Sequence, residues 1–210
     1  MRIYRNGIRP MIKVLVWDLA GVLLHTVKGT FESLLAERLD APEQAVYEAI
    51  RSEVNNRWDL GEIDDESYYT WMLQTLDQPL SKMPIVKKFV RDDFYVHPEM
   101  LAYIRNCHTR YSTVLLTNFP SHLHEFLRTV WNIDGTFDHI IASCDVKLLK
   151  PDPRMYQYAL DQAGCRAEEA VFIDDREGNV QGAQSIGMHG IVFINPQQAI
   201  HDLNALLAEK

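Results

Sequence analysis

The sequence predicts an α/β fold: a Rossmann-like doubly wound parallel sheet that carries an inserted all-helical cap. Two observations predict the sheet, and a third predicts the insertion. Five short apolar segments rich in Val and Ile alternate with segments of helical length, as in parallel sheets covered on both faces. The first two of these segments are separated by too much chain for one crossover helix, and the chain between them has helical patterning.

The predicted strands are the near-continuous apolar runs, which are 12–17, 112–117, 139–143, 170–174 and 190–194. Amphipathic segments at 98–107, 123–131, 154–164 and 180–187 supply the helices between the later strands. Gly164 and Gly187 stand where helix C-caps belong, because glycine readily adopts the left-handed conformation that ends a helix.

Residues 26–96 contain no strand-like run, but four segments with helical patterning: 31–39, 42–54, 64–76 and 83–94. Asp64 is a plausible N-cap of the third, with acids following it in the first turn. We therefore predict an α/β core domain formed by 11–25 and 97–210, a helical cap domain at 26–96, and an N-terminal leader at 1–10. An insertion that follows a strand end is well located to act as a lid.

Composition restricts the class of protein. The 210-residue chain is 47% hydrophobic, as expected for a globular protein, and has a net charge of −8, which disfavours partners such as nucleic acid or an anionic membrane. No apolar stretch approaches the roughly 18 residues of a membrane span. The three cysteines are an odd number without metal-ligand spacing, so we expect reduced thiols and a cytoplasmic location.

Polar residues follow four successive elements of the predicted sheet. Asp18 ends the first strand, Thr117 and Asn118 end the second, and Asp174 and Asp175 end the fourth. Lys150 precedes the helix that begins near residue 154. Ligands of open α/β sheets bind beyond the carboxyl ends of the strands, so these side chains form a candidate site.

The chemistry of this set points to phosphoryl transfer. Three carboxylates at one edge repel one another unless a cation lies between them, and Mg²⁺ prefers oxygen ligands. A hydroxyl, a backbone N–H and a Lys ammonium would hold a phosphate, which leaves Asp18 to act as the nucleophile. Each residue alone has an ordinary explanation, such as a helix N-cap, a turn or a solvated loop lysine. Their occurrence together favours the site.

Four motifs resemble those of the haloacid dehalogenase-like hydrolase superfamily over roughly residues 12–194. VLVWDLAGVLL is similar to the first motif, VLLTN to the second, LLKPDPRMYQYAL to the third and AVFIDDREGNVQGAQSIGMHGI to the fourth. The resemblance implies that Asp18 is the nucleophile, that Thr117 and the Asn118 amide hold the phosphoryl group, and that Lys150 stabilises it. It also implies that Mg²⁺ is bound by Asp18, Asp174, Asp175 and the backbone carbonyl of Ala20.

The insertion carries a resemblance of its own. RWDLGEIDDESYYTWM is similar to the helical cap of the subgroup that contains sugar-phosphate phosphatases and the N-terminal domains of soluble epoxide hydrolases. Trp58, Gly61 and Ile63 are the matching positions. We expect packing within the cap and a turn glycine there, rather than chemistry.

Position 20 departs from the family pattern. The phosphatases of the superfamily carry a second Asp there, which acts as general acid and base, and Ala20 can do neither. General acid–base catalysis is worth about 10²–10⁴-fold, so poor leaving groups should suffer most. We expect a magnesium-dependent phosphatase or phosphotransferase that acts on a small phosphorylated metabolite through an aspartyl-phosphate at Asp18, with weakened activity.

Two alternatives stay open at this point. A chain without the acid could be a catalytically silent relative that binds or regulates. Phosphonoacetaldehyde hydrolases share Asp-x-Ala-Gly and use a cap lysine, for which Lys28 is the nearest candidate, whereas haloacid dehalogenases also lack the second Asp but need no metal. The pair Asp174–Asp175 argues against the haloacid branch. We expect a monomer or a weak homodimer.

Overall fold

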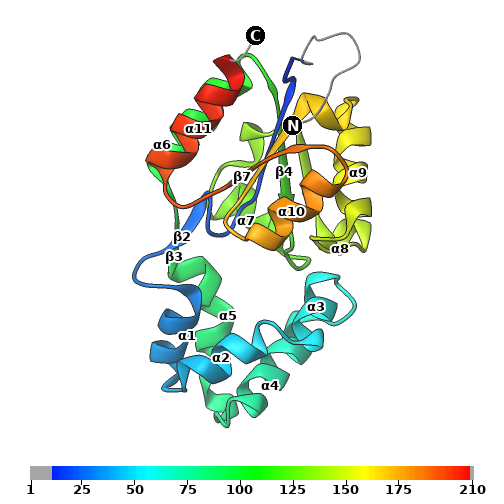
Figure 1. Ribbon diagram of the computed structural model, residues 1–210. Helices are drawn as coiled ribbons and strands as arrows, with labels where there is room; N and C mark the ends of the chain where they lie inside the picture. The colour runs from blue at the N-terminus through cyan, green and yellow to red at the C-terminus, as the bar shows by residue number, and fades with distance from the viewer. Residues whose placement is uncertain (1–10, 209–210) are drawn as a thin grey trace.

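The computed structural model describes residues 11–208, so the predicted leader lies outside the described residues. Its centre is a parallel five-stranded sheet with the order β5-β4-β1-β6-β7, shown in Figure 1. The strands are β1 Val14–Trp17, β4 Ser112–Thr117, β5 His139–Ala142, β6 Ala170–Asp174 and β7 His189–Val192. All five predicted strands and the predicted fold class are confirmed.

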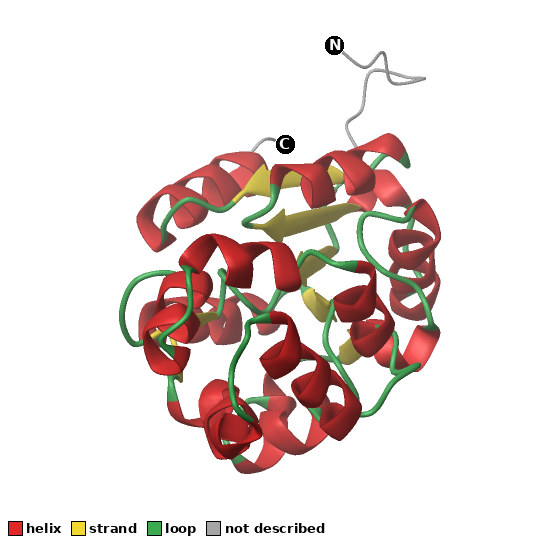
Figure 2. Ribbon diagram, turned by 90° about the horizontal axis from the view of Figure 1, so that it is seen from below, coloured by secondary structure: helices red, strands yellow, loops and turns green. Residues whose placement is uncertain are grey.

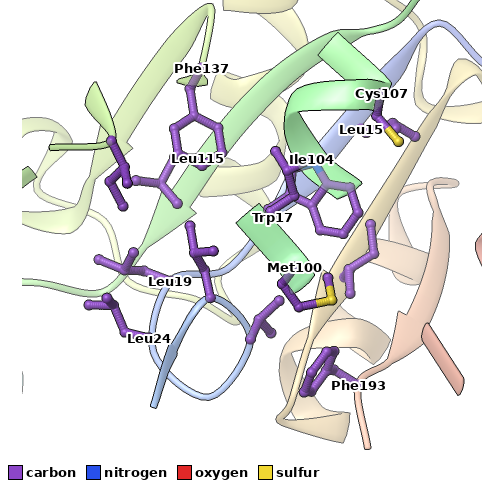
Figure 3. Close-up of a cluster of buried hydrophobic side chains, with 14 of the residues drawn as sticks. Leu15, Trp17, Leu19, Leu24, Met100, Ile104, Cys107, Leu115, Phe137 and Phe193 are labelled. Atoms are coloured by element: carbon purple, nitrogen blue, oxygen red, sulfur yellow. The ribbon is translucent and has the colours of Figure 1, made fainter. Parts of the chain in front are cut away.

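Alternating side chains of the strands build two hydrophobic layers. Leu15 and Trp17 belong to one buried cluster, and Val14 and Val16 belong to another, because successive residues of a strand point to opposite faces. Figure 3 shows the first cluster, in which Trp17 packs among side chains from α6 and β4. The core helices are α6 Pro98–His108, α7 Leu123–Thr129, α8 Ser143–Val146, α9 Pro153–Ala163, α10 Glu177–Ser185 and α11 Pro196–Ala208, with short 3₁₀ turns at Asp134–Thr136 and Ala167–Glu169.

The chain between the first two core strands forms a separate layer of helices below the sheet in Figure 1, which Figure 2 shows from its own side. We call residues 26–96 the helical insertion. Its elements are α1 Phe31–Leu39, α2 Glu43–Ala49, α3 Glu53–Asp59, α4 Asp65–Thr75, a 3₁₀ turn at Leu80–Lys82, and α5 Met83–Asp92. They bury a third hydrophobic cluster that shares no fully buried residue with the two sheet layers.

A small antiparallel pair joins the insertion to the core, and the sequence did not predict it. The strands β2 Leu24–Thr26 and β3 Phe94–Val96 pair with each other, so the expectation that 26–96 contains no strand was wrong. Three-residue strands are too short to show a period of two. Their pairing keeps the entry and exit of the insertion side by side, next to the loop after β1.

Other differences concern helix ends. The segment 42–54 forms two helices rather than one, because Ser52 caps α3 by accepting from the Asn55 N–H. The helix α10 starts before residue 180, and α11 was not predicted. Gly164 and Asp64 cap as predicted. Among the described residues, no helix is both long and apolar enough to cross a membrane.

Candidate active site

The register of the three central strands brings the predicted residues together. Trp17 of β1 lies opposite Leu115 of β4 and Ile173 of β6, and the Asp18 N–H donates to the Ile173 carbonyl at 2.9 Å. Asp18, Thr117 and Asp174 therefore emerge at the same carboxyl edge, where the strand order reverses direction around β1. Open α/β sheets bind their ligands at such a point.

Lys150 connects two of these carboxylates. Its Nζ lies 2.7 Å from Asp18 Oδ1 and 2.7 Å from Asp174 Oδ2, and its side chain is only 1% exposed. Although burial alone lowers the pKa of Lys150, the carboxylates of Asp18 and Asp174 raise it above its ordinary value. The ammonium is therefore a fixed positive charge at the centre of the site.

Asp18 itself is nearly inaccessible. Burial raises its pKa to about 7, the charges of Asp174 and Asp175 add to the rise, and Lys150 opposes it. A divalent cation next to this carboxylate would favour its ionised form. The site thus holds a carboxylate whose charge depends on the cations around it.

Asp174 is fully buried, and more groups hold its carboxylate than the sequence indicated. Asn179 Nδ2 donates to Asp174 Oδ1 and Oδ2, both at 3.0 Å, and the Arg176 N–H donates to Oδ1 at 2.8 Å. Our sequence interpretation missed Asn179. Its position in the first turn of the helix after Asp174 was a usable signal, because such a turn faces the strand end.

The three carboxylates meet the geometric requirement of a cation site. One oxygen each from Asp18, Asp174 and Asp175 lie within 4.8 Å of one another. Burial raises the pKa of Asp175 and the charge of Asp174 adds to this effect, while Arg176 and Lys150 oppose it. Hard oxygen ligands in this arrangement fit Mg²⁺.

Gly21 allows Asp175 to take its place in this set. Its φ is +86°, which L side chains rarely adopt, and a Cβ there would lie 2.4 Å from Asp175 Oδ2. The glycine of the first motif thus allows the left-handed turn and leaves room for the carboxylate of Asp175.

Asn118 makes contacts that the sequence did not predict. Its side chain accepts from the Lys150 N–H at 2.9 Å and donates to the Lys150 carbonyl at 3.1 Å. The side chain therefore fixes the loop of the lysine, and the prediction that the backbone N–H of Asn118 holds phosphate stays a prediction. Thr117, at the end of β4, is buried and lines the same cavity as Asp18, Asn118 and Lys150.

This cavity has a volume of about 630 Å³ and lies between the sheet edge and the helical insertion. Asp18, Ala20, Lys150 and Asp175 line its core side. Aromatic and aliphatic side chains of the insertion line the opposite part, namely Phe31, Leu35, Met72, Val86, Phe89 and Phe94. Ala20 is exposed and lines this cavity.

Three polar contacts fasten one corner of the insertion to the core. The Ser143 hydroxyl donates to the Asp59 carbonyl at 2.5 Å, and Lys147 Nζ donates to the Leu60 carbonyl at 2.6 Å. His122 Nδ1 lies 3.2 Å from Asp65 Oδ2. The turn at Gly61, with φ +64°, approaches Cys144 and Lys147 of the core closely.

The predicted packing positions behave as expected. The Trp58 ring stacks on Tyr68 with centroids 3.8 Å apart, and its Nε1 donates to Asp65.

Lys28 forms an ion pair with Glu37 at 2.9 Å and is 71% exposed. A Schiff-base lysine needs a site that shields it, so this geometry disfavours the role considered for Lys28.

Comparison with known proteins agrees with the fold and the motifs. A sequence model of the haloacid dehalogenase-like hydrolases matches residues 12–187. Sesquiterpene phosphatase astK of Aspergillus oryzae is 25% identical over 93% of this chain and 96% of its own length. Bifunctional epoxide hydrolase 2 of Mus musculus is 37% identical over 67 residues, which are 32% of this chain but only 12% of that protein.

Solved structures share the architecture. A predicted hydrolase of the same family from Porphyromonas gingivalis superposes with a TM-score of 0.76 at 24% identity, covering 96% of this chain and 100% of that one. An enzyme of the family from Bacteroides thetaiotaomicron, crystallised with magnesium and inorganic phosphate, gives a TM-score of 0.69 at 19% identity over 86% of this chain and 93% of that one.

Proposed function

Because the chain belongs to the haloacid dehalogenase-like hydrolase family, we propose that it is a magnesium-dependent phosphatase or phosphotransferase. It acts on small phosphorylated metabolites through an aspartyl-phosphate at Asp18. The observation that carries this proposal is the contact of Lys150 with both Asp18 and Asp174, at 2.7 Å each, beside a third carboxylate at Asp175. A buried lysine among acids at a strand edge is suited to a phosphoryl group.

Each residue then has a role that its surroundings support. Asp18 attacks phosphorus, Lys150 stabilises the oxygens of the transferring group, and Thr117 and the Asn118 N–H bind them. Asp18, Asp174, Asp175 and the Ala20 carbonyl would hold the cation. When bound, Mg²⁺ neutralises charge that develops on the phosphoryl oxygens.

The relatives support the choice of phosphoryl chemistry. The fungal relative is a phosphatase by name, and the Bacteroides relative shows that this fold accommodates magnesium and inorganic phosphate together. The carboxylate cluster supports a cation from this chain alone, because one oxygen each from Asp18, Asp174 and Asp175 lie within 4.8 Å of one another and Mg²⁺ prefers oxygen ligands.

The cavity favours a substrate with an apolar organic part. Beyond the charged edge, its wall includes Phe31, Leu35 and Met72, which would bind hydrocarbon, beside polar side chains such as Arg51 and Asn56. The helical insertion, residues 26–96, would then act as the cap domain that selects the substrate, in a cytoplasmic monomer or weak homodimer.

A second candidate is a protein that binds phosphate without turnover, and Ala20 is the observation that favours it. The test is Mg²⁺-dependent phosphate release from acetyl phosphate, p-nitrophenyl phosphate and octyl phosphate by the parent chain and its Asp18→Asn variant. Turnover that requires both Asp18 and Mg²⁺ supports the phosphatase. Binding of magnesium and phosphate without release from any of the three supports the silent protein.

A further inference from the structure

Ester cleavage needs a proton for the departing alcohol, and position 20 cannot provide one. Among the described residues, the acids that line the cavity are Asp18, Glu32, Asp59 and Asp175. Asp18 and Asp175 belong to the nucleophile and cation sites. Glu32 is engaged in an ion pair with Arg51 at 2.9 Å. Asp59 is the remaining carboxylic acid of the cavity.

We propose that Asp59, at the end of α3 in the helical insertion, is the general acid and base of this reaction in place of the acid absent at position 20. This inference rests on the proposed phosphatase function. The inference goes beyond the proposed function because it names a catalytic residue that comes from the insertion rather than from the core motifs.

The side chain of Asp59 is held in a fixed orientation. Asn55 Nδ2 donates to Asp59 Oδ2 at 3.0 Å, and Asn55 Oδ1 in turn accepts from the Tyr68 hydroxyl at 2.5 Å. Because Asn55 uses its oxygen to accept from tyrosine, its amide nitrogen is directed at the carboxyl group. A positioned acid transfers protons more effectively than a mobile one.

The backbone of Asp59 is tied to the phosphate end of the site. Its carbonyl accepts from the Ser143 hydroxyl, and the oxygen of Ser143 accepts from the Phe119 N–H at 2.9 Å. Phe119 follows Thr117 and Asn118 directly. One hydroxyl therefore links the proposed acid to the loop that carries the predicted phosphate ligands.

The charges around Asp59 suit an acid that works near neutral pH. Burial raises its pKa to about 7, while Arg176, the Asn55 amide and Lys150 oppose the rise. Tyr68, whose hydroxyl donates to Asn55, is neutral because burial raises its pKa well above the ordinary value. A group that is partly protonated at pH 7 can both give and accept a proton.

Both chemical steps then balance. In the first, the Asp18 carboxylate forms a bond to phosphorus, the bond from phosphorus to the substrate oxygen breaks, and Asp59 gives that oxygen a proton. In the second, Asp59 takes a proton from water, the water oxygen binds phosphorus, and the bond to Asp18 breaks. Phosphate leaves, and both carboxyl groups return to their starting states.

The experiment compares Asp59→Asn with the parent on two substrates that differ in leaving group. The value of kcat/KM reports only the steps up to departure of the leaving group, so slow hydrolysis of the intermediate does not enter it. Octyl phosphate needs the proton, whereas acetyl phosphate releases a stable acetate. We expect kcat/KM to fall about 100-fold for octyl phosphate and to stay within about threefold for acetyl phosphate.

The pH profile and two further variants separate catalysis from structure. In the parent, kcat/KM for octyl phosphate falls as the pH rises above about 7, and Asp59→Asn loses that fall. Glu62→Gln, an exposed acid of the same turn, leaves both substrates unchanged. Ala20→Asp combined with Asp59→Asn regains octyl phosphate turnover, because position 20 again provides an acid.

Equal losses on both substrates, no loss on either, or a double variant as slow as Asp59→Asn would each overturn the assignment. A parent that releases no phosphate even from acetyl phosphate removes the proposed function, and this inference with it.

Discussion

The side chain of Asn118 holds the main chain of Lys150 at both of its polar groups, with hydrogen bonds of 2.9 and 3.1 Å. The lysine that contacts two buried carboxylates is thereby fixed from the neighbouring strand end. In Asn118→Ala the backbone N–H of residue 118 remains, but both contacts to Lys150 are lost. We expect a loss of about 1–3 kcal/mol in unfolding free energy and a lower kcat on every substrate.

Urea unfolding and steady-state kinetics test this together. Asn118→Asp is the variant matched in size, since it keeps the acceptor for the Lys150 N–H, loses the donor and adds a negative charge. It should fall between the parent and Asn118→Ala. Full activity in Asn118→Ala would show that the loop holds its lysine without this side chain.

Gly21 provides a test of the cation site. In Gly21→Ala the new Cβ would meet Asp175 Oδ2 at 2.4 Å in a left-handed turn, so the carboxylate must move. We expect Mg²⁺ affinity, measured by isothermal titration calorimetry, to fall at least about tenfold. Gly135→Ala is the control, because a Cβ there meets nothing within 4 Å. Unchanged affinity in Gly21→Ala would remove Asp175 from the cation site.

The raised pKa of Asp18 predicts a pH effect on stability in EDTA. A carboxyl group whose pKa is about 7 in the folded state, against an ordinary value of 3.8, binds its proton more tightly when folded. Its contribution is complete below pH 3.8 and is lost as the pH rises toward 7. Asp18→Asn does not titrate, so its stability relative to the parent should increase between about pH 4 and 7. Thermal unfolding of the parent and Asp18→Asn across this pH range measures the change. A stability difference that stays constant with pH contradicts the raised pKa of Asp18.

The sequence predicted which residues meet at the sheet edge better than it predicted how they are held. Asp18 follows β1, and Thr117 and Asp174 end β4 and β6. Parallel strands end at one edge, so the convergence of these three residues could be inferred without coordinates. Their catalytic roles stay predictions. The contacts of Asn118 with Lys150 depend on loop geometry, which residue spacing does not determine.

The helical insertion also contains features that residue spacing does not determine. Helical periodicity predicted most of its helices, but β2 and β3 have three residues each and were missed. Asp59 could not be assigned to the site because its approach to the core depends on the Ser143 contact between elements far apart in the chain.

Ser143 links the insertion to the site, so its hydroxyl should matter for catalysis. Ser143→Ala leaves the Phe119 N–H without its partner and releases the Asp59 carbonyl. We expect a loss of about 1–3 kcal/mol in stability and a larger loss of kcat/KM for octyl phosphate than for acetyl phosphate. Ser185→Ala, which removes an exposed hydroxyl bonded within α10, should change neither. Equal kinetic losses on the two substrates would contradict a link to proton transfer.

The apolar wall of the cavity predicts a chain-length series. Each methylene buried on binding contributes about 0.8 kcal/mol, so kcat/KM should rise about threefold or more per carbon from ethyl to octyl phosphate. Phe31→Asn, in a side chain that is only partly buried, should flatten the series while leaving ethyl phosphate unaffected. A kcat/KM that does not change with chain length in the parent would contradict an apolar substrate and favour a polar one.

The central claim is that Asp18 becomes phosphorylated, and the direct measurement is chemical trapping of that bond. The chain is mixed with acetyl phosphate and Mg²⁺, quenched, reduced with borohydride and mapped by peptide mass spectrometry. An aspartyl-phosphate is reduced to homoserine, so we predict homoserine at position 18, and none after EDTA or in Asp18→Asn. Phosphate release without modification of Asp18, or reduction at a different residue, would contradict the account.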